Sequence, residues 1–177
     1  MTAGAIFPRV VVVSGRGNPA LGTLVAGTIH APCALGRSGT KQRKHEGDGA
    51  TPSGSFGLVA VLYRPDRGPR PRTRLPVTAI RENSGWCDDP IDRAYNREIR
   101  LPHPAGHERL WRNDRLYDVI VVIDYNLAHP IPGRGSAIFL HLASEDFAPT
   151  EGCLAVTPGT MARLLPRLAP GTVIDIR

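Results

Sequence analysis

Short apolar runs separated by glycine and proline limit what this chain can fold into. The sequence contains 19 glycines and 17 prolines, which cluster largely between the apolar runs and favour turns there. The runs are rich in Val, Ile, Phe and Tyr and have the length of strands. We therefore predict a mainly β fold, with strands near residues 9–13, 23–31, 56–63, 77–80, 119–125, 137–142, 154–157 and 172–176.

One segment near the end of the chain has the pattern of a helix. Thr157 can cap it, and Pro158 suits the first helical position. Apolar residues then recur at helical spacing, at Met161, Leu164, Leu165 and Leu168. Pro166 should end or bend this helix.

The middle of the chain, residues 81–115, is the least regular part of the sequence. We predict local helix at residues 89–98 and a helical turn at residues 108–113. A loop this long inside a compact domain is often functional, so this segment is a candidate site region.

The length of 177 residues fits a single domain that spans residues 1–177. No apolar stretch approaches the roughly 20 residues of a membrane span. Residues 1–22 lack the order of a secretory signal, so we expect that the chain stays inside or that its export signal is missing. The three cysteines are too few and too far apart for a disulfide framework.

The formal charge of +6 is concentrated in one tract. It contains Asp66 and five arginines, at positions 64, 67, 70, 72 and 74, and prolines interrupt it. We interpret the tract as an extended, solvated loop, with docking on an anionic polymer as the alternative. We therefore expect no nucleic-acid partner.

A histidine and a cysteine stand out near the end of the chain. His141 ends an apolar strand, and a loop of eleven residues separates it from Cys153, which opens the next strand. The loop can bring the two side chains together as a dyad in which the imidazole activates the thiol. Gly152 lacks a Cβ, so the Gly152 and Cys153 amides could form an oxyanion hole.

This segment resembles the active-site region of L,D-transpeptidases of the YkuD type. The match consists of a strand that ends in His141, a loop, and Thr150-Glu-Gly-Cys153 at the start of a strand. A second match is Lys44-His-Glu-Gly-Asp48 followed by Thr51-Pro-Ser-Gly-Ser-Phe56, which is similar to the substrate-side hairpin of the family. Gly85-Trp-Cys-Asp-Asp-Pro90 and Tyr95-Asn96 resemble a proteobacterial branch.

The resemblance implies a YkuD-like β-sandwich of mixed sheets with one or two short helices. It also implies acyl transfer between donor and acceptor stem peptides of peptidoglycan, through a thioester on Cys153 with His141 as base, and without metal or cofactor. Cross-links of the 3,3 type, or of the 1,3 type through the first L-residue, would form. We expect a monomer in the periplasm or cell envelope. The substrate-binding residues implied by the matched motifs are Thr150, Glu151, Trp86, Asp88, Tyr95 and Asn96.

Other functions remain open at this point. The same dyad could serve an L,D-carboxypeptidase or amide hydrolase with water as acceptor, and a non-catalytic module could bind cell wall. A zinc site could be proposed from His103, His107, Cys87 and Cys153, but Pro104 and Gly106 disfavour the helix that would align the two histidines. We expect a structural role for Cys33 and no chemical role for Cys87.

Overall fold

The computed structural model describes residues 5–177, so the first four residues of the stretch that we inspected for a secretory signal lie outside it. The prediction of a mainly β fold is confirmed. The elements, in chain order, are β1 (Arg9–Ser14), β2 (Leu21–Ala26), β3 (Ile29–Ala34), β4 (Thr40–Lys41), β5 (Thr51–Pro52), β6 (Gly54–Tyr63), β7 (Val77–Ala79), β8 (Ser84–Cys87), β9 (Glu98–Arg100), β10 (His107–Arg109), β11 (Val119–Ile123), β12 (Phe139–Leu142), β13 (Leu154–Val156), α1 (Pro158–Leu164), a 3₁₀ turn (Leu165–Arg167) and β14 (Val173–Ile176).

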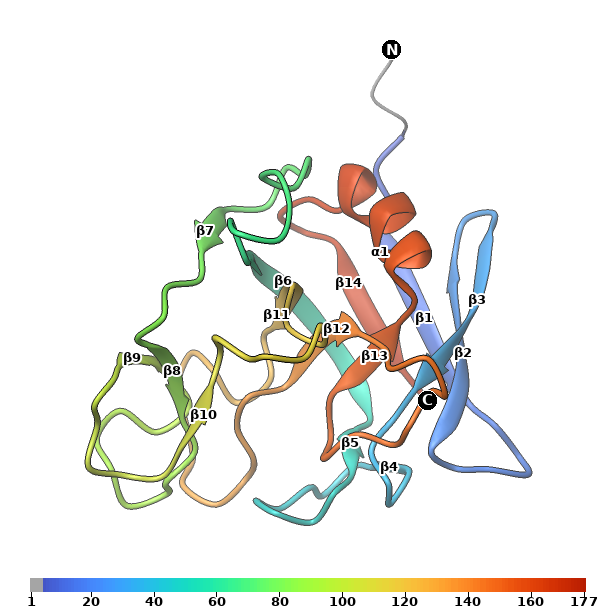
Figure 1. Ribbon diagram of the computed structural model, residues 1–177. Helices are drawn as coiled ribbons and strands as arrows, with labels where there is room; N and C mark the ends of the chain where they lie inside the picture. The colour runs from blue at the N-terminus through green and yellow to red at the C-terminus, as the bar shows by residue number, and fades with distance from the viewer. Residues whose placement is uncertain (1–4) are drawn as a thin grey trace.

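The main sheet is mixed and closes on itself. Its strand order is β11-β12-β13-β3-β2-β1-β14-β6-β7, and β11 also pairs with β6. The long strand β6 makes this closure possible, because Gly54–Gly57 pairs with β14 while Leu58–Tyr63 pairs with β11. The strands thus form a closed ring, with α1 at one end and the small sheet β10-β8-β9 to one side (Figure 1).

Two apolar clusters lie on opposite faces of the strands that carry the candidate dyad. Alternate residues of a strand point to opposite faces of the sheet. Leu140 and Leu154 belong to the larger cluster, which also includes the apolar face of α1. Phe139 and Cys153 belong to a smaller cluster with Trp86 of β8. The smaller cluster therefore lies between the ring and the small sheet.

The structure differs from the predicted elements in two places. The run at 23–31 is not one strand: β2 and β3 form a hairpin around Gly27, which has φ +57° and so needs the conformational freedom of glycine. The predicted helical segments at 89–98 and 108–113 are wrong, because these residues form turns and the short strands β9 and β10. Asx turns stabilise the irregular part, with Asp89 Oδ1 and Asp92 Oδ1 accepting from the amides of Ile91 and Ala94.

The predicted helix is confirmed. Thr157 caps α1 through its hydroxyl, which accepts from the Thr160 amide at 3.1 Å, and proline begins the helix. Met161 and Leu164 are buried against the ring. Within residues 5–177, no helix has the length and hydropathy needed to cross a membrane.

The arginine tract is only partly the solvated loop that we predicted. That interpretation is wrong for Arg64, which is 4% exposed. Its guanidinium makes two hydrogen bonds to Asp66 and stacks 3.6 Å from the ring centroid of Trp111. Arg67 bonds to Asp118, whereas Arg70, Arg72 and Arg74 are exposed as expected. The first half of the tract therefore anchors the loop to residues 111–118.

Candidate active site

Neighbouring parallel strands place His141 and Cys153 on the same face. In the β12–β13 pair, Leu140 lies opposite Leu154 and His141 opposite Ala155, so Cys153 lies beside Phe139. His141 and Cys153 are therefore diagonal neighbours on one face of the sheet, two residues apart in register. Both side chains line one cleft between the ring and the small sheet.

The Cys153 thiol is buried and makes hydrogen bonds to backbone. Its Sγ donates to Ala137 O at 3.1 Å, and the Phe139 amide acts to lower the pKa of the thiol. Ala137 has φ +52°, an unusual value for a residue with a side chain, and this conformation orients its carbonyl toward the thiol. Burial raises the pKa of Cys153 to about 12, and the charge of Glu108 adds to the effect. The resting sulfur is therefore a neutral thiol.

His141 is in its neutral form as well. Its Nδ1 lies 2.8 Å from Leu142 O, so this nitrogen carries the proton and leaves Nε2 as a proton acceptor. Burial lowers the pKa of His141 to about 4, although the bond to Leu142 opposes the shift. Within residues 5–177, no hydrogen bond joins the imidazole to the thiol. Both groups are thus neutral, and they do not form an ion pair in this structure.

The turn before Cys153 is fixed by a threonine and a glycine. Thr150 Oγ1 donates to Cys153 O at 2.7 Å and accepts from the Gly152 amide at 3.1 Å. Gly152 has φ +137°, and a Cβ at this position would lie 2.8 Å from Ala50 O. Only glycine fits this turn without a shift of the backbone. Because the Gly152 amide donates to Thr150, only the Cys153 amide of our predicted pair stays a candidate oxyanion donor.

The two motifs matched in the sequence lie against each other in space. Thr51, from the segment Thr51-Pro-Ser-Gly-Ser-Phe56, is fully buried and its hydroxyl donates to Cys153 O at 3.3 Å. The same hydroxyl accepts from the Gly36 amide at 2.8 Å. The upstream motif therefore holds the backbone of the candidate nucleophile in place through a hydrogen bond.

Lys44 is a buried cation next to this turn, and sequence reasoning assigned no role to it. Its side chain is 2% exposed and its Nζ donates to Asp48 Oδ1 at 2.9 Å. Nζ lies 3.3 Å from the point that a Cβ on Gly152 would occupy. Its charge acts on the thiol, because Lys44 lowers the pKa of Cys153 against the larger effect of burial.

Asp48 balances this cation. Burial opposes ionisation of its carboxyl group, but hydrogen bonds from the His45 and Ala50 amides and from Lys44 together hold its pKa well below the usual range. Lys44 and Asp48 were both quoted in the motif at 44–48, but their pairing is visible only in the structure.

Tyr117 and Glu108 are two further residues that the sequence did not reveal. The Tyr117 ring meets the His141 ring edge-on, with 5.1 Å between centroids. Its hydroxyl donates to Glu108 Oε1, and Arg112 lies 5.0 Å above its ring. Burial, with the nearby Cys153 and Glu108, raises the pKa of Tyr117 well above its usual value. Tyr117 thus packs against the imidazole as a neutral phenol.

Three of the predicted substrate-binding residues lie at the cleft. Thr150, Glu151 and Asp88 all line it. Glu151 is largely exposed and forms an ion pair with Arg37. Burial raises the pKa of Asp88, and the charge of Glu46 contributes. The predicted role of these three residues in substrate binding stays a proposal.

The other three lie behind the cleft wall. Asn96 accepts from Trp86 Nε1 and from the Ala137 amide, both at 3.0 Å, and it donates to the carbonyls of Tyr125 and Asn126. Tyr95 donates to Glu46, and its hydroxyl accepts from the Gly135 amide at 3.0 Å. Their hydrogen bonds order the residues around Ala137, and a direct contact of Trp86, Tyr95 or Asn96 with substrate stays a prediction.

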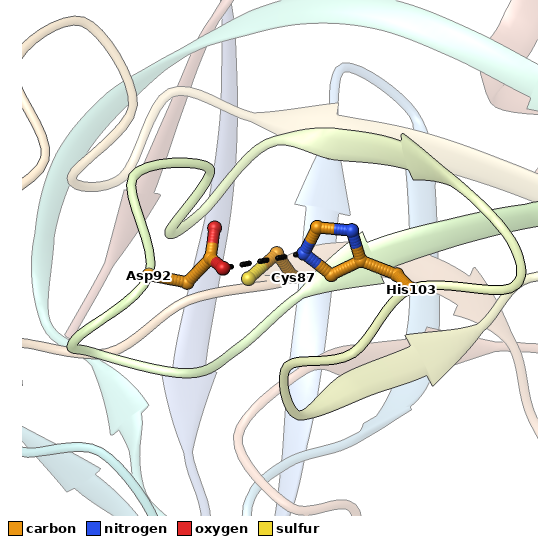
Figure 2. Close-up of side chains that lie close together, drawn as sticks. All are labelled: Cys87, Asp92 and His103. Carbon is orange, nitrogen blue, oxygen red and sulfur yellow. Dashed lines mark ion pairs between the residues drawn. The ribbon is translucent and has the colours of Figure 1, made fainter.

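The four residues considered for zinc do not form one site. Cys87 and His103 come close to each other, together with Asp92 (Figure 2). His107 instead places its Nδ1 2.8 Å from Ala105 O, and Cys153 lines the cleft. Cys33 is fully buried in the larger apolar cluster, and burial raises its pKa to about 12.

Comparisons with known proteins give one strong match. The family described as YkuD, L,D-transpeptidase catalytic domain, matches residues 11–176. Among solved structures, L,D-transpeptidase 1 of Mycobacterium tuberculosis is similar, with 14% identity, a TM-score of 0.40, and coverage of 95% of this chain and 61% of that one. An L,D-transpeptidase from Mycobacterium smegmatis has 14% identity, a TM-score of 0.43, and coverage of 95% and 58%. This chain therefore spans about three fifths of the length of these structures. Comparison with curated proteins gives no match.

Proposed function

We propose that this chain, which belongs to the YkuD family of L,D-transpeptidase catalytic domains, cross-links peptidoglycan stem peptides through a thioester on Cys153. The observation that carries the proposal is the shared face of β12 and β13, where His141 and Cys153 line one cleft. The match to the proteobacterial branch of the family stays a prediction.

In the first step, the Cys153 sulfur attacks the carbonyl carbon of an L-residue in the donor stem. His141 Nε2 takes the thiol proton as the S–C bond forms, and it gives this proton to the departing amine as the C–N bond breaks. A neutral imidazole suits this role, because only the unprotonated Nε2 can accept a proton. The product is a thioester on Cys153 and a released D-residue or longer fragment.

In the second step, a side-chain amine of the acceptor stem attacks the thioester carbon. His141 removes a proton from this amine, the S–C bond breaks, and the sulfur regains a proton. The new amide is a 3,3 cross-link, or a 1,3 cross-link when the donor is attacked at its first L-residue. With water in place of the amine, the same steps would amount to hydrolysis.

Negative charge develops on the carbonyl oxygen and on the Cys153 sulfur during the two steps, and we propose that the Cys153 amide and the Lys44 ammonium stabilise it. The Cys153 amide is our proposed donor to the oxyanion, and the Thr150 hydroxyl fixes the turn that positions this amide. The Lys44 ammonium, packed beneath Gly152, favours the thiolate that forms during attack. We propose that both effects lower the barrier to acylation.

The cleft wall offers contacts for the stem peptides. We propose that the carboxyl groups of Asp88 and Glu151 bind amino groups of the stem peptides, and that Thr150 borders the nucleophile. We propose that Trp86, Tyr95 and Asn96 contribute to substrate binding in two ways. They order the cleft wall around Ala137, and they contact the stem peptide. We further propose that the protein acts in the periplasm or cell envelope and is a monomer.

Labelling with a carbapenem tests the nucleophile. This class of acylating agent should add one molecule to the protein, and peptide mapping should find it on Cys153. Cys33→Ser and Cys87→Ser serve as controls that should label normally, whereas Cys153→Ser should not label. Label on another thiol, or none on a folded protein, would contradict the proposal.

Product analysis then separates transfer from hydrolysis. The enzyme is supplied with a tetrapeptide donor, with and without an acceptor stem that has a free side-chain amine. A cross-linked dimer that forms only with the acceptor supports transfer. Release of free tripeptide at the same rate in both reactions would support the hydrolase instead.

A further inference from the structure

Three side chains with metal-binding atoms converge at the small sheet, and none of the three lines the cleft. Cys87 ends β8, Asp92 lies in the turn that follows, and His103 lies in the loop after β9. The thiol, one carboxylate oxygen and one ring nitrogen all lie within 4.8 Å of one another (Figure 2). These residues play no part in the chemistry proposed for Cys153.

The ring nitrogen of His103 that faces this group has no hydrogen-bond partner. His103 Nε2 is buried, and it is the one buried side-chain nitrogen or oxygen within residues 5–177 that lacks a partner. It lies 3.4 Å from Asp92 Oδ2, but the pair does not have the geometry of a hydrogen bond. An unbonded buried polar atom is costly unless something occupies its lone pair.

The other two ligand atoms are also oriented for a shared cation. Asp92 uses Oδ1 to accept from the Ala94 amide at 2.7 Å, which leaves Oδ2 directed at the histidine. Cys87 is fully buried, and the carboxylates of Asp92, Asp88 and Asp89 all act on its thiol as negative charges. A cation placed among these groups would relieve their mutual repulsion.

We infer that Cys87, Asp92 and His103 form a binding site for a divalent transition metal, with zinc as the expected ion. Thiolate, imidazole and carboxylate are the three ligand types that zinc takes in proteins. Tetrahedral zinc places its ligand atoms roughly 3.4–3.6 Å apart, so small side-chain rotations from the present arrangement suffice. Binding would form S–Zn, N–Zn and O–Zn bonds, keep one water as the fourth ligand, and release the thiol proton and the other waters of the hydrated ion to solvent, with no change of oxidation state.

Such an ion would join the end of β8, the turn that carries Asp92 and the loop that carries His103. Asp88 and His107, near the ligands in sequence, line the cleft. The ion would therefore stabilise one wall of the substrate site without contact to the reacting atoms. This role is structural and does not depend on the proposed transfer reaction.

Cobalt binding tests the site directly. The untagged full chain is treated with chelator, desalted and titrated with Co²⁺, whose spectrum reports both a thiolate ligand and tetrahedral geometry. We expect one equivalent of Co²⁺ with a thiolate charge-transfer band, displaced by one equivalent of Zn²⁺. A wild-type protein that gives no such band, or that fails to compete with a zinc-binding dye at micromolar metal, overturns the inference without recourse to any variant.

Variants locate the site. Removal of a ligand by Cys87→Ser, Asp92→Asn or His103→Gln should weaken Zn²⁺ binding by at least the roughly 10–100-fold that loss of an outer-shell partner costs. Cys153→Ser and His107→Gln are matched controls and should bind as the wild type does. Zn²⁺ should raise the Tm of the controls but not of the ligand variants. Zinc that follows Cys153 instead of Cys87 would overturn the proposed site.

Discussion

The Lys44 ammonium packs against Gly152, 3.3 Å from the point where a Cβ would begin. Ala50 O is closer still to that point, at 2.8 Å, and the glycine has φ +137°. Even the smallest side chain at position 152 would therefore shift the backbone that carries Cys153.

Gly152→Ala should slow acylation of Cys153 by a carbapenem by about 100-fold or more, because displacement of a nucleophile by about 1 Å can have an effect of this size. Gly159→Ala is the matched control, since no atom lies within 4 Å of its added Cβ. The control should acylate at the wild-type rate. Equal rates in the two variants, measured by intact mass, would show that the turn tolerates a side chain.

Variants of Lys44 and Asp48 separate the effect of the Lys44 charge on the Cys153 thiol from its effect on protein stability. Lys44→Met removes a buried cation and leaves Asp48 without it, so we expect a loss of about 3–5 kcal/mol in the free energy of unfolding. The pKa of the Cys153 thiol should rise, because the lost charge favours the thiolate. The pH profile of Cys153 alkylation, read by mass, should therefore move to higher pH.

The double variant Lys44→Met/Asp48→Asn is the control for stability. It leaves no buried charge unpaired, since Lys41, which also pairs with Asp48, is about half exposed. Part of the lost stability should therefore return while the alkylation profile stays shifted. If the double variant regained the wild-type profile, the effect of Lys44 would be structural and not electrostatic.

The sequence predicted most of the ring strands because their apolar runs are local, although it merged β2 and β3 into one strand. It also placed His141 and Phe139 on one face, since strand periodicity alone fixes that relationship. The strands of the small sheet are only three or four residues long and lie in the irregular middle of the chain, so no local pattern marks them. The helix predicted at 89–98 failed because the side chains of Asp89 and Asp92 bond to nearby amides and favour turns.

The contacts around the candidate nucleophile could not be predicted from local sequence patterns. Lys44 reaches Gly152 only because the upstream motif folds beneath the turn, and Tyr117 reaches His141 through packing between two layers. The closure of the ring through β6 and β11 also depends on a long strand that changes partner midway. Each of these relationships joins segments that are far apart in the chain.

Asn96 should prove to be a positioning residue for the thiol. Its side chain holds the Ala137 amide, and Ala137 O in turn accepts from Cys153 Sγ. Asn96→Ala leaves buried partners without hydrogen bonds, so the free energy of unfolding should fall by at least about 2 kcal/mol. Asn96→Asp keeps the acceptor for Ala137 and should therefore acylate faster than Asn96→Ala.

Urea denaturation and single-turnover acylation measure the two effects on Asn96 variants. A wild-type acylation rate in a folded Asn96→Ala protein would count against the positioning role. A raised KM for the stem peptide with an unchanged acylation rate would instead support direct substrate binding.

Cys33 should be structural. It is fully buried in the larger apolar cluster, and its thiol donates to Ala34 O at 3.5 Å. Cys33→Ala leaves a small cavity, so we expect the free energy of unfolding to fall by about 1–2 kcal/mol. Carbapenem acylation of the folded variant should proceed at the wild-type rate, and a large decrease in that rate would argue for a role in the site.

The buried imidazole makes stability depend on pH in a defined window. The pKa of His141 is about 4 in the native protein and 6.5 in a model peptide, which stands for the unfolded chain. Between these values the unfolded chain binds the proton and the native protein does not. The free energy of unfolding should therefore fall as the pH is lowered through this window, by at most about 1.4 kcal/mol per pH unit, and this contribution should be fully present above pH 6.5.

Carboxyl groups with a raised pKa, such as those of Asp88 and Glu108, change stability in the opposite direction, so the wild-type curve alone is ambiguous. His141→Gln has a similar size and retains an N–H donor, but it cannot titrate. Subtraction of its curve from the wild-type curve isolates the histidine. The difference should slope between pH 4 and 6.5 and be flat above that range, as urea denaturation at each pH would show. A flat difference throughout would mean that the pKa of His141 is the same in the folded and unfolded states, contrary to the effect of burial. A slope of the opposite sign above pH 6.5 would mean that His141 is protonated in the folded protein, and it could then not serve as the base for Cys153 at neutral pH.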